Sequence, residues 1–191
     1  MSLYTKDNFN DPYVSIGDYT YGPLTIQKLS NNSLTTTIGK FCSIASKVVI
    51  AFWGRHRLED ITTYPFNELR PHGTNWPFVP LTPIDDSSEN VYIGNDVWLA
   101  HNALIMQGAH IGDGAVIGAN CIVAGNVRPY SIVVGNPARE IRKRFSETDI
   151  EKLQTIKWWD WNIEDIRKYL QFITNTNIDD LYNIWLNEVK K

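Results

Sequence analysis

His56 is the residue of this chain whose type and setting most favour chemistry. It lies in the segment GRHRLEDITTYPF, residues 54–66, between two arginines and shortly before Glu59 and Asp60. An imidazole exchanges a proton near neutral pH, which suits it to act as a general base. Glu59, Asp60 or a backbone carbonyl would orient such a ring. The alternative interpretation is a solvent-facing loop histidine.

The cysteines and the other histidines are weaker candidates for catalysis or metal binding. Cys42 and Cys121 have no metal-ligand spacing and each fits a small buried position, so we expect free, packed thiols in a reducing cytoplasm. No G-x-S-x-G nucleophile motif occurs in the chain. His72 has no motif around it, and His101 and His110 fall outside the buried repeat positions described below. We therefore expect no metal and no covalent enzyme intermediate.

Positive charge is concentrated in one short run. REIRKR, residues 139–144, places four cations in six residues of a chain whose formal net charge is −3. Such a run either binds phosphate groups or forms a solvated basic edge. The overall charge argues against nucleic-acid binding. The N-terminus lacks an apolar signal core, and no run approaches the ~18 apolar residues of a membrane-spanning helix, so we expect no membrane insertion.

A six-residue repeat supplies the framework that would position these residues. Neither a helix, with a period near 3.6, nor a simple strand, with a period of about 2, gives strict sixes. A hexapeptide repeat does, because each unit forms one short strand and one corner of a triangular coil. The inward aliphatic series is Ile93, Leu99, Ile105, Ile111, Ile117 and Val123, and the inward small series is Val97, Ala103, Ala109, Ala115, Cys121 and Val127. The register recurs upstream at Ile38, Ile44 and Ile50, with Cys42 and Val48 in the small positions.

Two segments depart from the repeat. Residues from about 51 to 90 follow no period and are rich in Pro, Trp, Tyr and Phe; long insertions of this kind are usually functional, although a tolerated surface insertion is the alternative. Ser146 to Asp149 indicates a capped helix start, and two further helices are expected near 163–173 and 178–190. The tryptophans of WWDW, residues 158–161, are expected to fill a core. We therefore expect a repeat domain over residues 1–145 and a helical segment over residues 146–191.

Taken together, these segments resemble the hexapeptide-repeat acyltransferases, and more closely their xenobiotic branch. That branch includes the chloramphenicol and streptogramin acetyltransferases and related sugar O-acetyltransferases. The likeness rests on IGKFCSIA (38–45), GRHRLED with TYPF (54–66), IGNDVWLA (93–100), IGDGAVIGAN (111–120) and VVGNPAREIRKRF (133–145). It implies a mainly β fold, a left-handed parallel β-helix with a long excursion loop and a C-terminal helical segment. It also implies a homotrimer with active sites between subunits.

The resemblance implies a direct transfer from acetyl-CoA to a small-molecule acceptor. His56 matches the loop histidine that deprotonates the acceptor hydroxyl or amine, which then attacks the thioester. The aromatic side chains of Tyr21, Tyr64 and Trp98 are candidate walls of the acceptor site beside His56.

Coenzyme A presents an extended amide chain and phosphate groups. The resemblance implies that backbone groups at Ala119 and Ala124, where side chains are small, pair with the pantetheine arm. It also implies that the phosphates contact cations of the basic run, for which the candidates are Arg139, Arg142 and Lys143.

The sequence leaves the acceptor open. We expect a hydroxyl of a sugar or surface-polysaccharide precursor; inactivation of chloramphenicol or streptogramin A, or N-acetylation of an amino sugar, are the alternatives, since aromatic walls suit sugars and flat antibiotics alike. A γ-type carbonic anhydrase on the same fold would need three converging histidines, and His101 and His110 lack the expected H-x4-H spacing. A non-catalytic solenoid scaffold would need neither the histidine loop nor the basic run.

Overall fold

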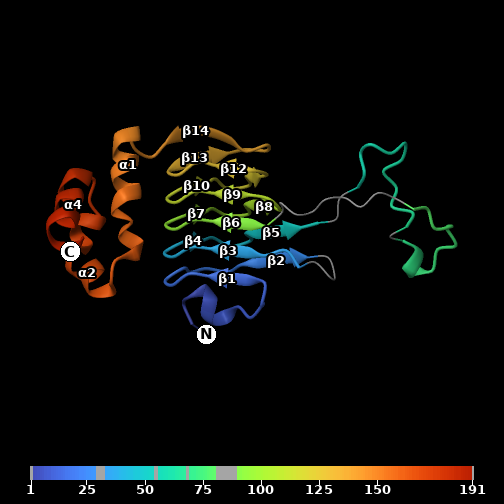
Figure 1. Ribbon diagram of the computed structural model, residues 1–191, viewed down its shortest axis with the longest axis horizontal. Helices are drawn as coiled ribbons and strands as arrows, with labels where there is room; N and C mark the ends of the chain where they lie inside the picture. Colours follow the sequence, from blue (N-terminus) through green and yellow to red (C-terminus); the bar gives the residue numbers. More distant parts are fainter. Residues whose placement is uncertain (1, 29–32, 54–55, 68, 81–89, 191) are drawn as a thin grey trace.

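The chain winds into a triangular prism of stacked coils whose three faces are sheets of short strands (Figure 1). The computed structural model describes residues 2–28, 33–53, 56–67, 69–80 and 90–190. Parallel sheets of this kind are typical of a left-handed β-helix, as the resemblance implied. We name the faces after one residue of each: the His110 face, the Trp98 face and the Ile105 face.

Each face collects one strand from successive coils. The His110 face contains β1 (Val14–Ile16), β3 (Thr36–Ile38), β6 (Val91–Ile93), β9 (His110–Ile111) and β12 (Asn126–Val127). The Trp98 face contains β4 (Ser43–Ile44), β7 (Trp98–Leu99), β10 (Val116–Ile117), β13 (Ser131–Val134) and β14 (Arg139–Lys143). The Ile105 face contains β2 (Thr25–Lys28), β5 (Val49–Phe52), β8 (Leu104–Met106) and β11 (Ile122–Val123). A short 3-10 turn, η1 (Thr5–Asn8), precedes the first coil, and β14 pairs antiparallel with β13 at the last one.

The core of the prism confirms the predicted repeat register. Every residue of the aliphatic and small series from Ile93 to Val127 is buried, and so are the upstream residues that continue both series. The prism is narrow, so one aliphatic and one small side chain from each hexapeptide fill it. Removing this apolar surface from water is the main contribution that favours the fold.

The corner between the His110 and Trp98 faces is built from small and polar residues that stack from coil to coil. Asn95 donates its backbone and side-chain N–H groups to Asp113 Oδ1 at 2.7 and 2.9 Å. The Oδ1 atom of Asn95 accepts from the backbone N–H of Lys40 at 2.8 Å. A Cβ added to Gly94 would lie 2.7 Å from the Asp113 backbone nitrogen, so this close approach of the coils requires glycine.

The C-terminal helices pack against this same corner. The predicted first helix is confirmed as α1 (Glu147–Ile156). Ser146 is its N-cap, and the Ser146 Oγ accepts from the Asp149 N–H at 3.2 Å. The later elements are η3 (Trp158–Asp160), α2 (Ile163–Lys168), α3 (Leu170–Ile173), α4 (Ile178–Ile184) and the π-helical turn η4 (Trp185–Val189). The helix expected over residues 163–173 is thus divided at Tyr169, where the backbone leaves the helical conformation. Trp159 and Trp161 are buried as predicted, in a second apolar cluster that also includes Tyr130 of the prism.

The excursion leaves the prism between the Ile105 and His110 faces. Strand β5 continues to Phe52, and both Ala51 and Phe52 are buried, so the departure begins slightly later than the predicted residue 51. Residues 54–55, 68 and 81–89 of the predicted excursion lie outside the described residues. The described parts, 56–67 and 69–80, which we call the arm, lie beyond the prism on the side opposite the helices and contain the short turn η2 (Arg70–His72) (Figure 1).

Candidate active site

A row of outward-facing side chains crosses the Trp98 face, because the strands of that face pair in register. The row consists of Tyr21, Ser43, Trp98, Val116, Ile132 and Arg142. Tyr21 and Trp98 are 46% and 52% exposed. Paired strands lie ~4.8 Å apart, so the three steps from Trp98 to Arg142 cover roughly 14 Å of the face. Three residues predicted for acceptor and coenzyme binding therefore share one line.

A groove of about 430 Å³ follows the upper part of this row. Its lining combines the row residues Ser43, Trp98, Val116, Ile132 and Arg142 with Phe41, Asp96, Val97 and Arg144 of the neighbouring corner. The floor is apolar, one wall is aromatic and one end is cationic. Such a groove suits an extended, mostly uncharged ligand that ends in an anionic group.

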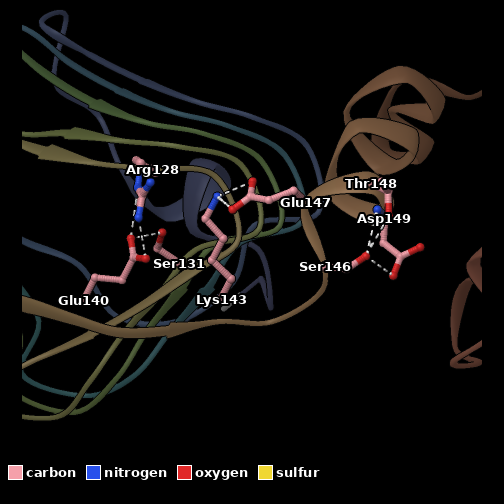
Figure 2. A network of polar contacts seen from close by, with 8 residues as sticks. All are labelled: Arg128, Ser131, Glu140, Lys143, Ser146, Glu147, Thr148 and Asp149. Carbon is pink, nitrogen blue, oxygen red and sulfur yellow. Dashed lines mark hydrogen bonds and ion pairs between the residues drawn. The ribbon is translucent and has the colours of Figure 1, made fainter.

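The basic run forms β14, the outermost strand of this face. Arg139 and Arg142 are exposed, and their described hydrogen bonds reach only the backbone oxygens of Ala138 and Lys143. Lys143 Nζ instead forms an ion pair with the Glu147 carboxylate at 2.6 Å (Figure 2). Two of the three predicted phosphate-binding cations thus face solvent, whereas the third is already paired.

Arg144, the last cation of the basic run, bonds to two residues of the corner between the His110 and Trp98 faces. Its Nη1 donates to Asp96 Oδ2 at 3.1 Å and to the Gly114 carbonyl at 2.8 Å. Burial raises the pKa of the Asp96 carboxyl, while the nearby guanidinium acts in the opposite direction. This ion pair joins β14 to the coil that carries Trp98.

Glu140 anchors β14 to the strand beside it (Figure 2). Its Oε2 accepts from Ser131 Oγ at 2.5 Å, and its Oε1 accepts from Arg128 Nη2 at 2.6 Å. The hydrogen bond from Ser131, followed by that from Arg128, lowers the pKa of Glu140. Sequence reasoning missed this cluster, because only the antiparallel pairing of β13 and β14 brings the three residues together.

The two predicted pantetheine positions lie at different corners of one coil. Ala119 follows β10, between the Trp98 and Ile105 faces, and Ala124 follows β11, between the Ile105 and His110 faces. Both are exposed, but one chain does not bring them together. His101 is exposed at the corner of Ala119, where Asn120 N–H donates to the His101 carbonyl at 3.0 Å. Its Nδ1 lies 2.9 Å from Ser46 Oγ, a partner that sequence reasoning missed.

His56 is exposed on the arm, and a backbone carbonyl orients its ring. Nδ1 lies 2.5 Å from the Thr63 carbonyl oxygen, which can only accept, so this contact fits the tautomer with its proton on Nδ1 and Nε2 as the acceptor. Asp60, one of the residues considered for this role, is paired with Arg57 at 3.1 Å. Of the orienting groups left open by the sequence, the backbone carbonyl is the one that contacts the ring.

Tyr64 lies next to the carbonyl that holds His56. Its ring packs against Phe66 at a centroid distance of 4.7 Å, and Phe66 contacts Trp76 edge-to-face at 5.0 Å. Asn67 and Val79 are joined by two hydrogen bonds that brace the arm. One chain therefore collects the predicted residues in two separate groups, His56 with Tyr64 on the arm and Tyr21 with Trp98 and Arg142 on the prism (Figure 1).

The cysteines, and the residue types that bind metals, form no further candidate site among the described residues. Cys42 and Cys121 are free and buried, and burial raises the pKa of the Cys42 thiol to about 11. Within the described ranges, no group of three or more His, Cys, Asp or Glu residues is arranged to hold a metal ion. Among the helices described here, none has the length and apolar character that crossing a bilayer requires.

Comparison with known proteins agrees with the fold. Residues 90–125 match the family model for the bacterial transferase hexapeptide (six repeats). A hexapeptide-repeat acetyltransferase from Vibrio cholerae, solved with acetyl-CoA, superposes with a TM-score of 0.50 at 25% identity, covering 71% of this chain and 62% of that one. The fold and the family match thus define a transferase of the hexapeptide-repeat class.

Two curated relatives narrow the class. A probable macrolide acetyltransferase of Lysinibacillus sphaericus is 45% identical over 152 residues, 76% of this chain and 81% of the relative. A chloramphenicol acetyltransferase of Escherichia coli is 40% identical over 150 residues, 78% of this chain and 70% of the relative. The chain belongs to the xenobiotic branch of the hexapeptide-repeat acetyltransferases, and it is an O-acetyltransferase that uses acetyl-CoA.

Proposed function

We propose that this protein acetylates a hydroxyl group of a ring-containing antibiotic of the chloramphenicol, streptogramin or macrolide kind. The sequence first favoured a sugar acceptor; the named relatives support the antibiotic alternative better. The observation that carries the proposal is the row on the Trp98 face, which places aromatic surface and a cation at opposite ends of one apolar groove. A flat apolar acceptor matches the aromatic end, and coenzyme A matches the rest.

Coenzyme A lies along the groove in this proposal. Its phosphates contact Arg142 and Arg139, and its pantetheine amides pair with backbone groups at the Ala119 corner, which borders the Trp98 face, and at the Ala124 corner of a neighbouring subunit. Lys143 adds a contact only when its ion pair with Glu147 opens. The thioester then lies near Trp98, three strands from Arg142.

His56 supplies the base. Its Nε2 removes the proton of the acceptor hydroxyl, whose oxygen attacks the acetyl carbonyl carbon. The carbon–sulfur bond breaks, the acetyl group stays on the acceptor oxygen, and the coenzyme A thiolate leaves and takes up a proton. The Thr63 carbonyl holds Nδ1–H throughout, which keeps Nε2 ready to accept.

The reaction needs more than one chain. Figure 1 shows the arm on the far side of the prism from the C-terminal helices, and its exposed apolar side chains include Leu58, Ile61 and Phe78. We propose that the chain forms a homotrimer in which the arm of one subunit covers the Trp98 face of the next. This assembly buries apolar surface of the arm and brings His56 to the groove of a neighbour.

Thiol release from acetyl-CoA tests the proposal. The acceptors are chloramphenicol, a streptogramin A, a macrolide and a panel of sugars and amino sugars. We expect release with an antibiotic, and a loss of at least ~100-fold in His56→Ala, the lower end of general-base effects. His72→Ala, which alters another exposed histidine of the arm, is the matched control and keeps full activity.

Each other outcome of this experiment contradicts one part of the proposed function. Turnover with sugars alone overturns the acceptor class. Equal activity of His56→Ala and the control overturns the assigned base. Acetyl-CoA binding without turnover of any antibiotic likewise overturns the acceptor class.

A further inference from the structure

A second cavity, of about 350 Å³, lies beneath the C-terminal helices. The prism contributes Phe41, Asp96, Tyr130 and Arg144 to its walls, and the helical segment contributes mainly apolar side chains such as Trp158. Its volume falls in the range of ordinary small-molecule pockets, which are mostly apolar with a few polar groups. His56, Trp98, Arg139 and Arg142 do not line it, although Phe41, Asp96 and Arg144 line both this cavity and the groove on the Trp98 face.

Tyr130 brings an unsatisfied polar group to this wall. Its side chain is 1% exposed, and its hydroxyl has no hydrogen-bond partner among the described residues. The ring is closely packed, since a Cβ added to Gly114 would lie 2.4 Å from it and Phe145 contacts it edge-to-face at 5.8 Å. A buried hydroxyl without a partner destabilises the folded state, so a polar atom bound against Tyr130 recovers part of that loss.

Arg144 and Asp96, which line the cavity with Tyr130, indicate which kind of polar atom fits there. The described hydrogen bonds of Arg144, to Asp96 and Gly114, use only Nη1, and a guanidinium has five N–H donors. The Arg144 guanidinium carbon lies 5.4 Å from the centroid of the Tyr130 ring, so the two donors are close together and an acceptor oxygen is the group that matches both. The Asp96 carboxylate on the same wall repels an anion, so the matching ligand is neutral.

The apolar walls define the rest of the ligand. Phe41 and Trp158 pack with their ring centroids 4.7 Å apart, and both line the cavity. Aromatic surfaces of this kind favour a ring. The helices that cover the cavity are tied down by an ion pair between Lys152 and Asp179 and by a hydrogen bond from Gln154 to Asp113 at 3.3 Å.

We propose that this cavity binds a neutral, ring-containing and mainly apolar molecule that carries a carbonyl oxygen. The oxygen accepts hydrogen bonds from Tyr130 and Arg144, and the ring packs against Phe41 and Trp158. The site is distinct from the groove on the Trp98 face, but it shares Phe41, Asp96 and Arg144 with that groove. A bound molecule therefore contacts residues that also border the proposed coenzyme site.

Acetophenone is the probe, because it combines a phenyl ring with one carbonyl oxygen. Titration calorimetry and thermal unfolding follow its binding to the full chain, with benzoate and ethylbenzene as comparisons. We expect saturable binding of one acetophenone per chain and a rise in melting temperature. Benzoate and ethylbenzene bind at least ~10-fold more weakly, because one is charged and the other lacks the acceptor oxygen.

Variants locate the site. Leu170→Trp places bulk at the rim, where Leu170 lines the cavity and is 51% exposed, and we expect it to weaken acetophenone binding at least tenfold. Leu186→Trp is the matched control, since Leu186 is 42% exposed and does not line the cavity. Thr174→Trp, also at the rim, replaces Leu170→Trp if that variant does not fold.

Tyr130→Phe tests the chemistry. We expect it to fold at least as stably as the wild type and to bind acetophenone no better than ethylbenzene. Undiminished acetophenone binding in Tyr130→Phe, or equal binding in the rim variant and Leu186→Trp, overturns the proposal, and so does absence of binding to the wild type. None of these measurements uses a transferase assay, so they are independent of the proposed function.

Discussion

Two residues of the row on the Trp98 face, Trp98 and Arg142, have different proposed roles. Trp98 offers a half-exposed aromatic surface, whereas Arg142 offers a cation whose described contact is only to a neighbouring backbone oxygen. Both were expected from the sequence, because they stand in stretches that resemble a family. That they lie on one line follows only from the strand register.

Arg142→Ala separates coenzyme binding from catalysis. We predict that the Michaelis constant for acetyl-CoA rises about tenfold or more while kcat stays within about twofold, because a charged hydrogen bond to phosphate contributes ~1.5–3 kcal/mol. Steady-state kinetics with varied acetyl-CoA measure both. Arg167→Ala, which removes an exposed guanidinium of α2 that is paired with Glu164 at 2.7 Å, is the control. Equal Michaelis constants in the two variants exclude Arg142 as a phosphate ligand.

The strands of the prism were predictable from the sequence where they follow the six-residue repeat. Ile105 and its equivalents were assigned correctly, because a six-residue period leaves the same trace in every coil. Phe52 was assigned to the excursion although it is a buried strand end, because an aromatic residue breaks the aliphatic pattern there. The Thr63 carbonyl was not identifiable as the partner of His56, since every residue has a carbonyl and the fold of the arm selects one. The cluster of Arg128, Ser131 and Glu140 was not predictable either, because only the pairing of β13 with β14 brings the three side chains together.

Glu140 makes the attachment of β14 depend on pH. Its pKa lies below the ordinary value of 4.5, so its carboxylate stabilises the folded state at neutral pH, and this contribution is lost as the pH falls through the folded pKa. We predict that Glu140→Gln lowers the melting temperature by roughly 2–4 °C at pH 7, as a loss near 1 kcal/mol does in a chain of this size. The difference from the wild type shrinks as the solution is acidified below pH 4.5.

The control for that prediction is Glu151→Gln, which changes an exposed carboxylate on α1. Thermal unfolding by circular dichroism at several pH values measures both variants. A pH-independent difference between Glu140→Gln and the wild type would show that the side chain acts through packing rather than through its charge.

In the whole molecule, the arm carries His56 and Tyr64, whereas the prism carries the predicted site residues of the Trp98 face. The arm holds itself together through the Tyr64, Phe66 and Trp76 rings, and Figure 1 shows it projecting away from the prism. Ala119 and Ala124 likewise face two different corners. The homotrimer proposed above would bring both sets of separated residues together, because a cleft between two prisms borders one corner of each. The sequence could not show this separation, because motifs recognised along a chain do not tell how far apart the fold places them.

Subunit mixing tests this arrangement. We predict that His56→Ala and the double variant Trp98→Ala/Arg142→Ala, each inactive alone at low acetyl-CoA, regain activity when they are unfolded, mixed in equal amounts and refolded. If the arm of one subunit serves the face of the next, random assembly creates an intact site at about one quarter of the interfaces. Thiol release measures the recovery, and His56→Ala refolded alone is the control. If each chain instead closes its own arm over its own face, every site in the mixture carries one defect, and activity stays at the level of the separate variants.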